Sequence, residues 1–274
     1  MATALITGGT SGIGAAFARQ LAARGYDLVL VARNEERLAA SASELYAATG
    51  IHVETIAADL AVRSDVVRVA ARIEDADRPI DLLINNAGLG VHTLLTDPAV
   101  DIHEHAFDVM CRAILILGGA AGRAMSARGS GAILNISSLQ ARFATGSYSA
   151  MKAWLTAYSE SLSVELRGTG VSVTVLMPGW VSTEWHARAG VKTSSIPDWL
   201  WTKPEDVARA ALRDVDRRRV ISIPTVRYRA IGWFARHLPR TTVRWVSGKI
   251  TSRRRGTNAG AEGSEHPVVK AEEN

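Results

Sequence analysis

The chain has 274 residues, 47% hydrophobic and 22% charged, a composition typical of a globular protein with ample material for a core. A single cysteine, Cys111, excludes an internal disulfide and fits a reducing cytoplasm. Eleven arginines, one lysine and no acidic residue lie between Arg217 and Arg255, a charge of +12, so the other 20 basic and 27 acidic residues leave the rest at −7. So local an asymmetry argues against a nucleic-acid-binding fold.

Apolar runs alternate with amphipathic stretches along the first 225 residues, and this alternation predicts βαβ units. Strands are expected at residues 4–7, 27–32, 53–57, 82–85, 132–137, 171–177 and 220–223. Helices are expected from the glycine loop to Gly25 and at residues 35–48, 64–75, 100–127, 147–167 and 204–217. The fold predicted for residues 1–225 is a single α/β domain of the Rossmann type, a doubly wound parallel sheet of about seven strands.

Residues 226–250 are predicted to form a basic amphipathic extension. Apolar residues recur at helical spacing away from the arginines, and Pro239 separates two such patterns: Ile231, Phe234, Ala235 and Leu238, then Val243, Val246 and Ile250. This stripe could lie on an anionic membrane, or pack on the body or on a second subunit, which we favour. Residues 251–274 have little to bury and are expected to form a disordered tail.

No signal peptide is expected at the start of the sequence, and no uncharged apolar run approaches the roughly 20 residues that a membrane-spanning helix needs. We therefore expect a cytoplasmic protein.

A glycine-rich loop, Thr7-Gly-Gly-Thr-Ser-Gly-Ile-Gly14, follows the first expected strand. Glycine suits this turn because its backbone adopts angles that other residues resist, and because a pyrophosphate can approach it closely. The next helix would point its free N–H groups at that phosphate. Glycine-rich loops by themselves are weak signals, but the position directly after a strand indicates a dinucleotide site.

Four further motifs follow in order: Asn85-Asn-Ala-Gly88, Asn135-Ile-Ser-Ser138, Tyr148-Ser-Ala-Met-Lys152 and Pro178-Gly-Trp-Val-Ser-Thr183. Together with the loop spacing T-G-x-x-x-G-I-G, they make the sequence resemble the short-chain dehydrogenase/reductases of the short-length type over about residues 3–185. Y-x-x-x-K alone recurs by chance, whereas five motifs in one order are specific. The resemblance implies an NAD(P)-dependent oxidoreductase that moves a hydride between nicotinamide and a carbonyl or secondary alcohol, as a homodimer or homotetramer.

The resemblance also implies which residues contact the cofactor. They are Gly8, Ser11, Gly12, Ile13, Gly14, Asp59, Leu60, Asn86, Ala87, Gly88, Tyr148, Lys152, Pro178, Gly179, Val181 and Thr183.

Tyr148 and Lys152 are four residues apart, so they lie on one face of a helix. A tyrosine with a pKa near 10 is a poor acid–base group at neutral pH, but a neighbouring ammonium and an oxidised nicotinamide should lower that pKa. Tyr148 could then protonate a carbonyl or deprotonate an alcohol, while Ser138 hydrogen-bonds the same oxygen. The resemblance adds that Lys152 holds the nicotinamide ribose. The predicted catalytic residues are therefore Ser138, Tyr148 and Lys152. The competing interpretation is that Tyr148 and Lys152 are ordinary side chains on a surface helix.

Two departures from the family pattern concern this site. Ser138 and Tyr148 are ten residues apart, about three fewer than in most relatives, so Ser137 is an alternative to Ser138. Met110 stands where relatives usually carry a catalytic asparagine. Because a thioether does not hold the water that such an asparagine positions, proton delivery should take another route.

Cofactor choice is read at the end of the second expected strand, where NAD enzymes usually place an acidic residue. Here the residues are Ala32 and Arg33, and a guanidinium can pair with a 2′-phosphate. We predict NADP as the cofactor, with NADPH preferred over NADH. The competing interpretation of Arg33 is a solvated residue at a helix start.

The expected substrate is a small-molecule carbonyl or alcohol. Bulky residues follow Thr183, in the region that forms the substrate lid in relatives: Trp185, His186, Trp199 and Trp201. They indicate an apolar or aromatic substrate, although packing within the lid explains them equally well. His92, His103 and His105 lack the spacing of a metal site, so no metal is expected.

Two other functions were weighed. A cofactor-binding scaffold or redox sensor with reduced catalysis would suit Met110 and the basic extension, but intact Ser138, Tyr148 and Lys152 argue against it. Sugar-nucleotide epimerases and dehydratases also use Y-x-x-x-K, yet they resemble T-G-x-x-G-x-x-G in the loop and have a longer C-terminal substrate domain. We therefore set the sugar-nucleotide epimerases and dehydratases aside.

Overall fold

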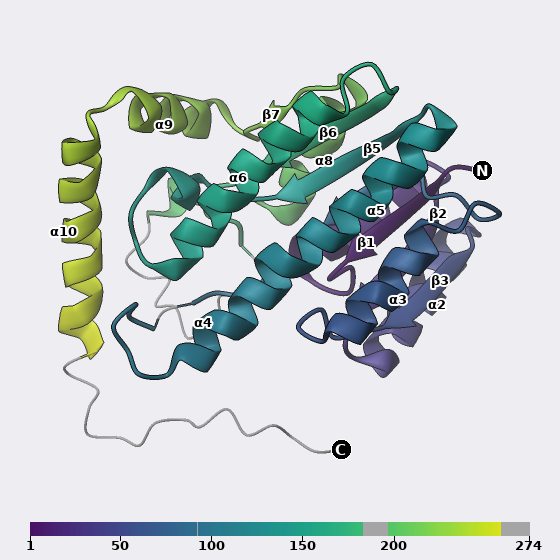
Figure 1. Ribbon diagram of the computed structural model, residues 1–274, viewed down its shortest axis with the longest axis horizontal. Helices are drawn as coiled ribbons and strands as arrows, with labels where there is room; N and C mark the ends of the chain where they lie inside the picture. The colour runs from purple at the N-terminus through teal and green to yellow at the C-terminus, as the bar shows by residue number, and fades with distance from the viewer. Residues whose placement is uncertain (92, 183–196, 259–274) are drawn as a thin grey trace.

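The computed structural model describes residues 1–91, 93–182 and 197–258, with side chains described as far as Lys249. Within these residues seven parallel strands form one sheet, in the order β3-β2-β1-β4-β5-β6-β7 (Figure 1). The strands are β1 (Thr3–Thr7), β2 (Asp27–Ala32), β3 (Val53–Ala57), β4 (Leu82–Asn85), β5 (Gly131–Ile136), β6 (Val171–Leu176) and β7 (Ile221–Ser222). The strand order reverses between β1 and β4, and ligands of such sheets bind at the carboxyl edge beside that point.

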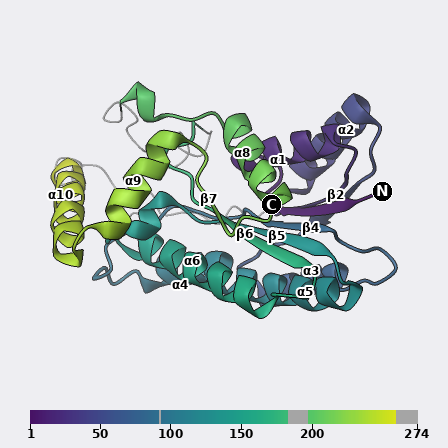
Figure 2. The ribbon, with the colours of Figure 1, turned by 90° about the horizontal axis from the view of Figure 1, so that it is seen from above.

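Helices cover both faces of the sheet (Figure 2). One face carries α1 (Gly12–Ala23), α2 (Glu35–Thr49) and α8 (Pro204–Asp216). The other carries α3 (Arg63–Ile73), α4 (Val100–Phe107), η1 (Asp108–Arg112), α5 (Ala113–Arg128) and α6 (Ser147–Glu165). The remaining described helices are the short η2 (Leu139–Arg142) and η4 (Asp198–Leu200), then α9 (Val226–His237) and α10 (Arg240–Asn258). The predicted doubly wound α/β fold is confirmed.

Alternating side chains of each strand enter one of two cores. Leu5 and Leu83 face the layer of α3, α5 and α6, whereas Ile6 and Ile84 face the layer of α1 and α8. All four are fully buried, which explains why the strands are apolar on both faces. Packing against two layers fixes the register of β1 on β4, and with it the position of the loops that leave their ends.

Local patterns predicted most element boundaries within one or two residues. The expected strands at 27–32, 53–57 and 82–85 coincide with β2, β3 and β4, and Gly50 ends α2 in the left-handed conformation at φ +72°. The last strand is shorter than expected, because only Ile221 and Ser222 pair with β6.

The C-terminal segment differs from its prediction. The expected break at Pro239 lies between α9 and α10, but α10 continues to Asn258, so the prediction of a disordered tail from residue 251 is wrong for residues 251–258. A composition poor in apolar residues predicts little burial, yet arginine is a good helix former, and no proline follows Pro239 until Pro267. The rest of the expected tail, residues 259–274, lies outside the described residues.

The continuous helix Val100–Arg128 is the one described helix that is long and apolar enough to cross a membrane by those two criteria alone. Of its most apolar window, 61% is buried inside the protein. Its apolar side chains, such as Ala113 and Leu117, fill the core on one face of the sheet, so the composition follows from its place in the core.

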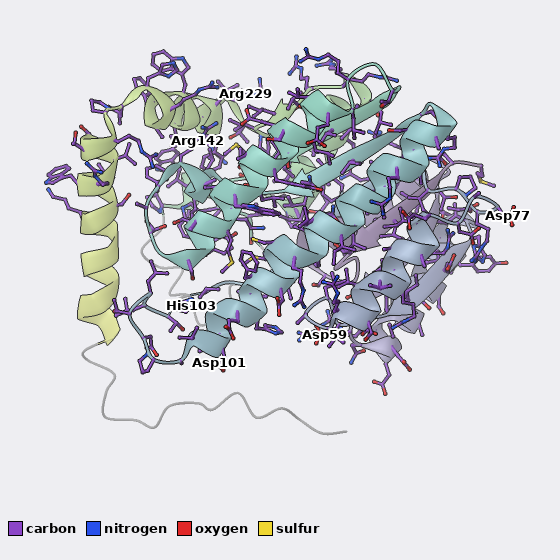
Figure 3. All side chains as sticks on the ribbon, viewed as in Figure 1. Asp59, Asp77, Asp101, His103, Arg142 and Arg229 are labelled. Carbon is purple, nitrogen blue, oxygen red and sulfur yellow. The ribbon has the colours of Figure 1, made fainter. Side chains whose placement is uncertain are left out.

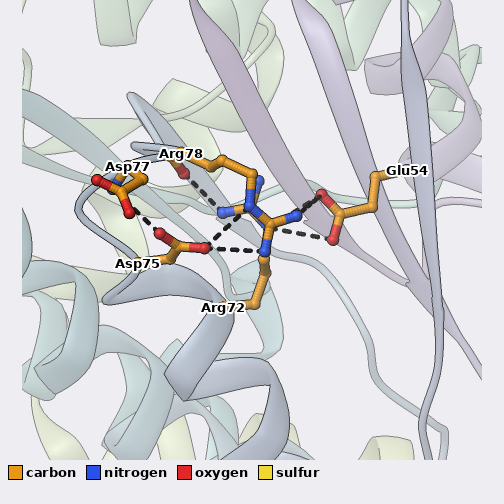
Figure 4. A network of polar contacts seen from close by, with 5 residues as sticks. All are labelled: Glu54, Arg72, Asp75, Asp77 and Arg78. Atoms are coloured by element: carbon orange, nitrogen blue, oxygen red, sulfur yellow. Dashed lines mark hydrogen bonds and ion pairs between the residues drawn. The ribbon is translucent and has the colours of Figure 1, made fainter.

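Ion pairs join β3 to the end of α3 (Figure 4). Arg72 Nε lies 2.9 Å from Glu54 Oε2, and Arg78 Nη2 lies 2.8 Å from Asp75 Oδ2. The hydrogen bond from Arg78 lowers the pKa of Asp75. These contacts follow the last turn of α3, at the amino edge of the sheet, so they stabilise the edge opposite the loops described next.

Candidate active site

The glycine loop between β1 and α1 is packed so closely that larger residues do not fit. Gly8 and Gly12 have φ values of +67° and +54°. A Cβ atom on Gly14 would lie 2.1 Å from the Gly8 carbonyl oxygen. The first intrahelical bond runs from the Ala15 N–H to the Ser11 carbonyl, which leaves the amides of Gly12, Ile13 and Gly14 for an anion at the helix N-terminus.

The segment after β4 is fastened to this loop. Thr7 Oγ1 accepts hydrogen bonds of 3.0 Å from the backbone N–H groups of Asn86 and Ala87. The Asn86 side-chain amide donates to the carbonyls of Thr7 and Gly8 at 3.0 and 3.1 Å. The loop and the Asn85–Gly88 motif therefore form one rigid edge at the strand-order reversal, as a dinucleotide site requires.

Ser138, Tyr148 and Lys152 converge at the end of β5. Ser138 caps η2, its Oγ accepting the Gln140 N–H at 3.1 Å, and its hydroxyl is near enough to Tyr148 to lower the pKa of that phenol. Lys152 Nζ donates to the Ile136 carbonyl at 2.8 Å and lies 5.7 Å from the centroid of the Tyr148 ring. The short connection from Ser138 to Tyr148 thus closes without separating the two side chains.

Ser137, the alternative to Ser138, is used elsewhere. Its Oγ donates to the Lys152 carbonyl at 2.8 Å and lies 2.9 Å from Thr156 Oγ1, so it fastens α6 to β5 from below. This buried contact favours Ser138 as the residue that faces a substrate.

Burial controls the charge of the Tyr148–Lys152 pair. Burial raises the pKa of Tyr148 to about 12, and the hydrogen bond from Ser138 opposes that rise. Burial also lowers the pKa of Lys152 to about 8. The expectation that the pKa of Tyr148 is lowered is therefore not met by the protein's own groups, because desolvation of the phenolate outweighs the opposing effect of Ser138.

Met110 lies in η1, a π-helical turn inside the long α4–α5 helix, and is fully buried. A Cβ atom on Gly88 would lie 3.5 Å from Met110 Sδ and 3.7 Å from Lys152 Nζ, so the thioether and the ammonium flank the same glycine. Methionine offers only a weak acceptor beside Lys152, at the position where the family resemblance led us to expect an asparagine.

Two buried asparagines lie behind this site. Asn85 Nδ2 donates to Asn135 Oδ1 at 2.9 Å, and Asn135 Nδ2 donates to Ser159 Oγ at 2.9 Å. Asn85 Oδ1 has no hydrogen-bond partner among the described residues, so one buried acceptor near the end of β4 is left for a water.

Two guanidinium groups border the cofactor side of the edge. Arg33 is exposed directly after β2, beside the glycine loop. Arg37, which the sequence did not single out, extends from α2 to the loop, where its Nη2 lies 3.4 Å from the Thr10 carbonyl. Arg37 lies in the first turn of α2, shortly after Arg33, and this nearness in the sequence would have been the signal that both cations lie near the end of β2.

Asp59 and Leu60 follow β3 at the same carboxyl edge (Figure 3). Asp59 Oδ1 accepts the Ala61 N–H at 2.9 Å, and the Leu60 side chain is buried. The turn is therefore held by its own side chain, which suits a wall beside a ligand.

The loop after β6 is held by the C-terminal helix α9. The Leu139 N–H donates to the Pro178 carbonyl at 3.0 Å, which places this loop next to Ser138. Tyr228 Oη accepts the Trp180 N–H at 2.9 Å and donates to the Leu200 carbonyl. A Cβ atom on Gly179 would lie 2.0 Å from the Tyr228 ring, so this glycine is needed for close approach.

His103 links α4 to the start of α6 (Figure 3). Its Nδ1 lies 2.9 Å from Ser147 Oγ and its Nε2 lies 3.0 Å from the Leu94 carbonyl. This ring therefore positions the helix turn that carries Tyr148, a role that the sequence did not indicate. Among the described residues no group of histidine, cysteine or acidic side chains could hold a metal ion.

Four predicted residues lie outside the described residues: Thr183 of the cofactor set, Trp185 and His186 of the lid, and His92.

The family model described as short chain dehydrogenase matches residues 2–192. An uncharacterised oxidoreductase of Staphylococcus saprophyticus is 32% identical over 234 residues, covering 83% of this chain and 97% of its own. A solved short-chain dehydrogenase from Sphingobium yanoikuyae, in complex with NADPH, is 31% identical with a TM-score of 0.77, over all of this chain and 99% of that one. A bulky-bulky ketone specific alcohol dehydrogenase from Comamonas testosteroni is 28% identical with a TM-score of 0.73, over all of this chain and 97% of that one.

The five motifs recognised in the sequence thus lie along one edge of a parallel sheet, in the order and fold of these relatives. The family match covers well over half of the chain. This protein belongs to the short-chain dehydrogenase/reductase family and is an oxidoreductase of that family, acting on alcohol or carbonyl groups.

Proposed function

We propose that this enzyme is an NADPH-dependent reductase of ketones or aldehydes with bulky apolar groups. The observation that carries the proposal is the convergence of Ser138, Tyr148 and Lys152 beside the glycine loop and the Asn85–Gly88 segment. A homodimer or homotetramer stays a prediction from the family resemblance.

Each catalytic side chain has a proton placed for one task. Ser138 Oγ accepts from the Gln140 N–H, so its own hydroxyl proton is available to hydrogen-bond a substrate oxygen. The Tyr148 hydroxyl donates the proton that converts the carbonyl oxygen to an alcohol. One N–H of the Lys152 ammonium donates to the Ile136 carbonyl. The other two remain to bind the ribose hydroxyls and to face Tyr148. A bound nicotinamide supplies the hydride to the carbonyl carbon.

The charge state of Tyr148 supports the reductive direction. Burial raises the pKa of Tyr148, so in the absence of an oxidised nicotinamide the phenol keeps its proton at neutral pH, and a proton donor is what carbonyl reduction needs. Alcohol oxidation needs the phenolate. We expect ketone reduction to vary little across neutral pH, and alcohol oxidation to rise steadily as the pH is increased.

Aromatic side chains near the Pro178–Val181 loop support an apolar substrate. The ring centroids of Trp180 and Trp201 are 6.0 Å apart, and the Trp199 side chain on η4 is 60% exposed. Because the Leu139 N–H bonds the Pro178 carbonyl, this aromatic surface adjoins Ser138. The Comamonas relative acts on bulky ketones, which supports the same substrate class here.

Arg33 and Arg37 support the preference for NADPH. Both lie at the edge where a ribose 2′-phosphate would bind, and loss of a hydrogen bond to a charged group typically costs about 1.5–3 kcal/mol. We expect Arg33→Ala and Arg37→Ala each to weaken NADPH binding more than NADH binding in fluorescence titrations. Equal losses for the two nucleotides would contradict this assignment.

The test of the catalytic assignment is Tyr148→Phe, assayed with a panel of bulky and small ketones and NADPH absorbance. Removing the proton donor while keeping the ring should lower kcat by roughly 10²–10⁴-fold and leave NADPH affinity nearly unchanged. Tyr158→Phe, on the same helix and with a buried phenol, is the matched control. Wild-type turnover in the Tyr148 variant would sink the assignment. Lack of turnover by the wild type on every ketone would instead favour a cofactor-binding scaffold or redox sensor.

A further inference from the structure

The two C-terminal helices, α9 and α10, form an arm (residues 226–258) at one end of the molecule (Figure 1). No acidic residue occurs between Arg217 and Arg255, although the rest of the chain carries a net charge of −7. Figure 2 places α10 at the end farthest from α2, beyond α9 and α6. The arm is therefore a basic projection from a mildly acidic body.

One side of the arm is fastened to the catalytic loops. Tyr228, Gly232 and Ala235 are the buried positions of α9, and Gly232 packs against Leu139, the neighbour of Ser138. On α10 the buried Ser247 accepts the Ala144 N–H at 3.0 Å. The expectation that the arm packs on the body is confirmed for this side. The predicted stripe is wrong in part, because Phe234 and Leu238 are exposed and Tyr228 and Gly232 replace them.

The opposite side of the arm exposes large apolar side chains. The exposed fractions are 78% for Val226, 58% for Trp233, 59% for Phe234, 41% for Leu238 and 62% for Trp245. Trp233 and Phe234 are in ring contact, and exposed apolar groups that adjoin one another often mark an interaction surface.

Basic side chains occur on the same two helices as these rings. The Trp233 ring packs edge-on against Phe234 with centroids 5.1 Å apart, and Lys249 Nζ lies 3.8 Å from the Trp245 centroid. Exposed guanidinium groups accompany them on the same two helices: Arg229, Arg236, Arg240 and Arg244.

A further arginine crowds the arm from the body. Arg142 of η2 lies close enough to Arg236 that burial first, and then the charge of Arg236, lower the pKa of Arg142, while Glu160 offsets part of that effect. Two neighbouring guanidinium groups that repel each other would be relieved by an anion. Figure 3 shows Arg142 and Arg229 at this end of the molecule, under and beside α9.

We propose that the exposed side of the arm docks on an anionic lipid membrane. Trp233, Phe234 and Trp245 enter the interfacial region, where amphipathic aromatic rings are stable, and Arg236, Arg240 and Arg244 contact lipid phosphates. The partner must accept apolar rings and many cations at once. A nucleic acid would pair with the cations but leave Val226 and Leu238 in water. The arm of a second copy carries the same positive charge, so the two arms would repel each other.

Docking would also place the catalytic site near the bilayer. The fastened side of the arm contacts Leu139, Ala144 and the Gly179 loop, so the membrane would lie one helix away from Ser138. An apolar carbonyl compound partitions into lipid and would reach the site from there, a consequence that rests on the proposed function, whereas the docking itself does not.

The test is co-sedimentation of the full chain with phosphatidylcholine vesicles, with and without phosphatidylglycerol. Binding is expected to the anionic vesicles, and it should weaken steeply between about 0.05 and 0.5 M salt. Each basic residue near an anionic surface strengthens partitioning about fivefold, so a triple Arg236→Gln, Arg240→Gln, Arg244→Gln variant should bind roughly 100-fold more weakly. The matched control changes Arg63, Arg123 and Arg167 to glutamine and should bind like the wild type.

A second pair of variants separates the apolar contribution. Trp233→Ser with Phe234→Ser should also lower partitioning, whereas Tyr46→Ser with Val67→Ser, which removes exposed apolar groups from α2 and α3, should not. Salt-insensitive binding to neutral vesicles, or equal losses in arm and control variants, would overturn the proposal. So would an absence of vesicle binding combined with arm-dependent self-association in sedimentation velocity, or with arm-dependent binding to duplex oligonucleotides.

Discussion

The glycine loop and the arm differ in how closely their backbones are packed. At Gly14 an added Cβ would lie 2.1 Å from the Gly8 carbonyl oxygen, whereas at Gly248 of α10 no atom lies within 4 Å. The positions of Gly8, Gly12 and Gly14 have a backbone conformation or packing that only glycine fits, and under the proposed function the free amides of the loop would bind a phosphate. The arm tolerates many residues on its outer side, where charge and apolar area matter more than fit. The function proposed for the loop therefore depends on its shape, and the function proposed for the arm depends on its composition.

The two regions adjoin different residues of the candidate catalytic set. The Asn86–Gly88 segment, held by the loop through Thr7, adjoins Lys152, while Tyr228 of the arm holds the Pro178–Val181 loop beside Ser138. The division into a catalytic domain of residues 1–225 and a separate extension therefore understates the extension, because Tyr228 completes the wall of the site.

The largest effect is expected where the loop is tightest. Gly14→Ala places a methyl group against the Gly8 backbone carbonyl, at a cost of about 1–3 kcal/mol, and if the displaced loop loses this amount in binding, nucleotide affinity falls by roughly 5- to 150-fold. Fluorescence titration with NADPH measures the loss. Affinity within a few fold of the wild type would show that the loop is less constrained than its contacts indicate.

In the loop, glycine suits both the proposed phosphate binding and the packing. At Lys152 the two requirements conflict, because the proposed function needs a charged side chain at a buried position. Its folded pKa of about 8 lies below the usual value of 10.5, so the unfolded chain binds more protons between these two pH values. The buried charge destabilises the fold fully below about pH 8, and that cost disappears as the pH rises towards about 10.5.

Lys152→Met should therefore abolish activity and raise the free energy of unfolding by about 1–3 kcal/mol at pH 7, with a smaller gain at pH 10. Thermal denaturation of both proteins across this pH range gives the difference. A gain that stays constant with pH would mean that the ammonium is not the cause.

Tyr228→Phe uncouples the arm from the site with the ring retained. The variant loses the hydrogen bonds to the Trp180 N–H and the Leu200 carbonyl, which should cost about 1–3 kcal/mol of stability and raise KM more than it lowers kcat. Tyr46→Phe, on the exposed side of α2, is the control and should change neither. An unchanged KM in the Tyr228 variant would make that residue a packing group only.

The smallest effect, of opposite sign, is expected in α10. Gly248→Ala meets no atom within 4 Å and replaces a poor helix former inside a helix, so it should stabilise the arm by up to about 1 kcal/mol. Hydrogen exchange of the α10 amides is a direct measurement. A loss of stability would indicate that the exposed side of α10 is covered in solution.

The sequence alone determined the fold class, most strand boundaries and the Tyr148–Lys152 pair. These features have short-range signals: apolar runs of strand length, a glycine cluster after the first run, and two residues four apart on a helix. Arg33 belongs with them, because its place follows directly from the end of β2.

Only the tertiary structure decided the surroundings of the catalytic pair. The contact of Tyr228 with Trp180 joins residues 48 apart, and that of His103 with Ser147 joins residues 44 apart, so no local pattern carries them. The direction of the Tyr148 pKa shift likewise depends on how much water the folded chain removes from the phenol. Helical spacing gave the amphipathic character of α9, but which stripe is buried was set by the positions of Leu139 and Ile223 in the folded body, which pack on Gly232.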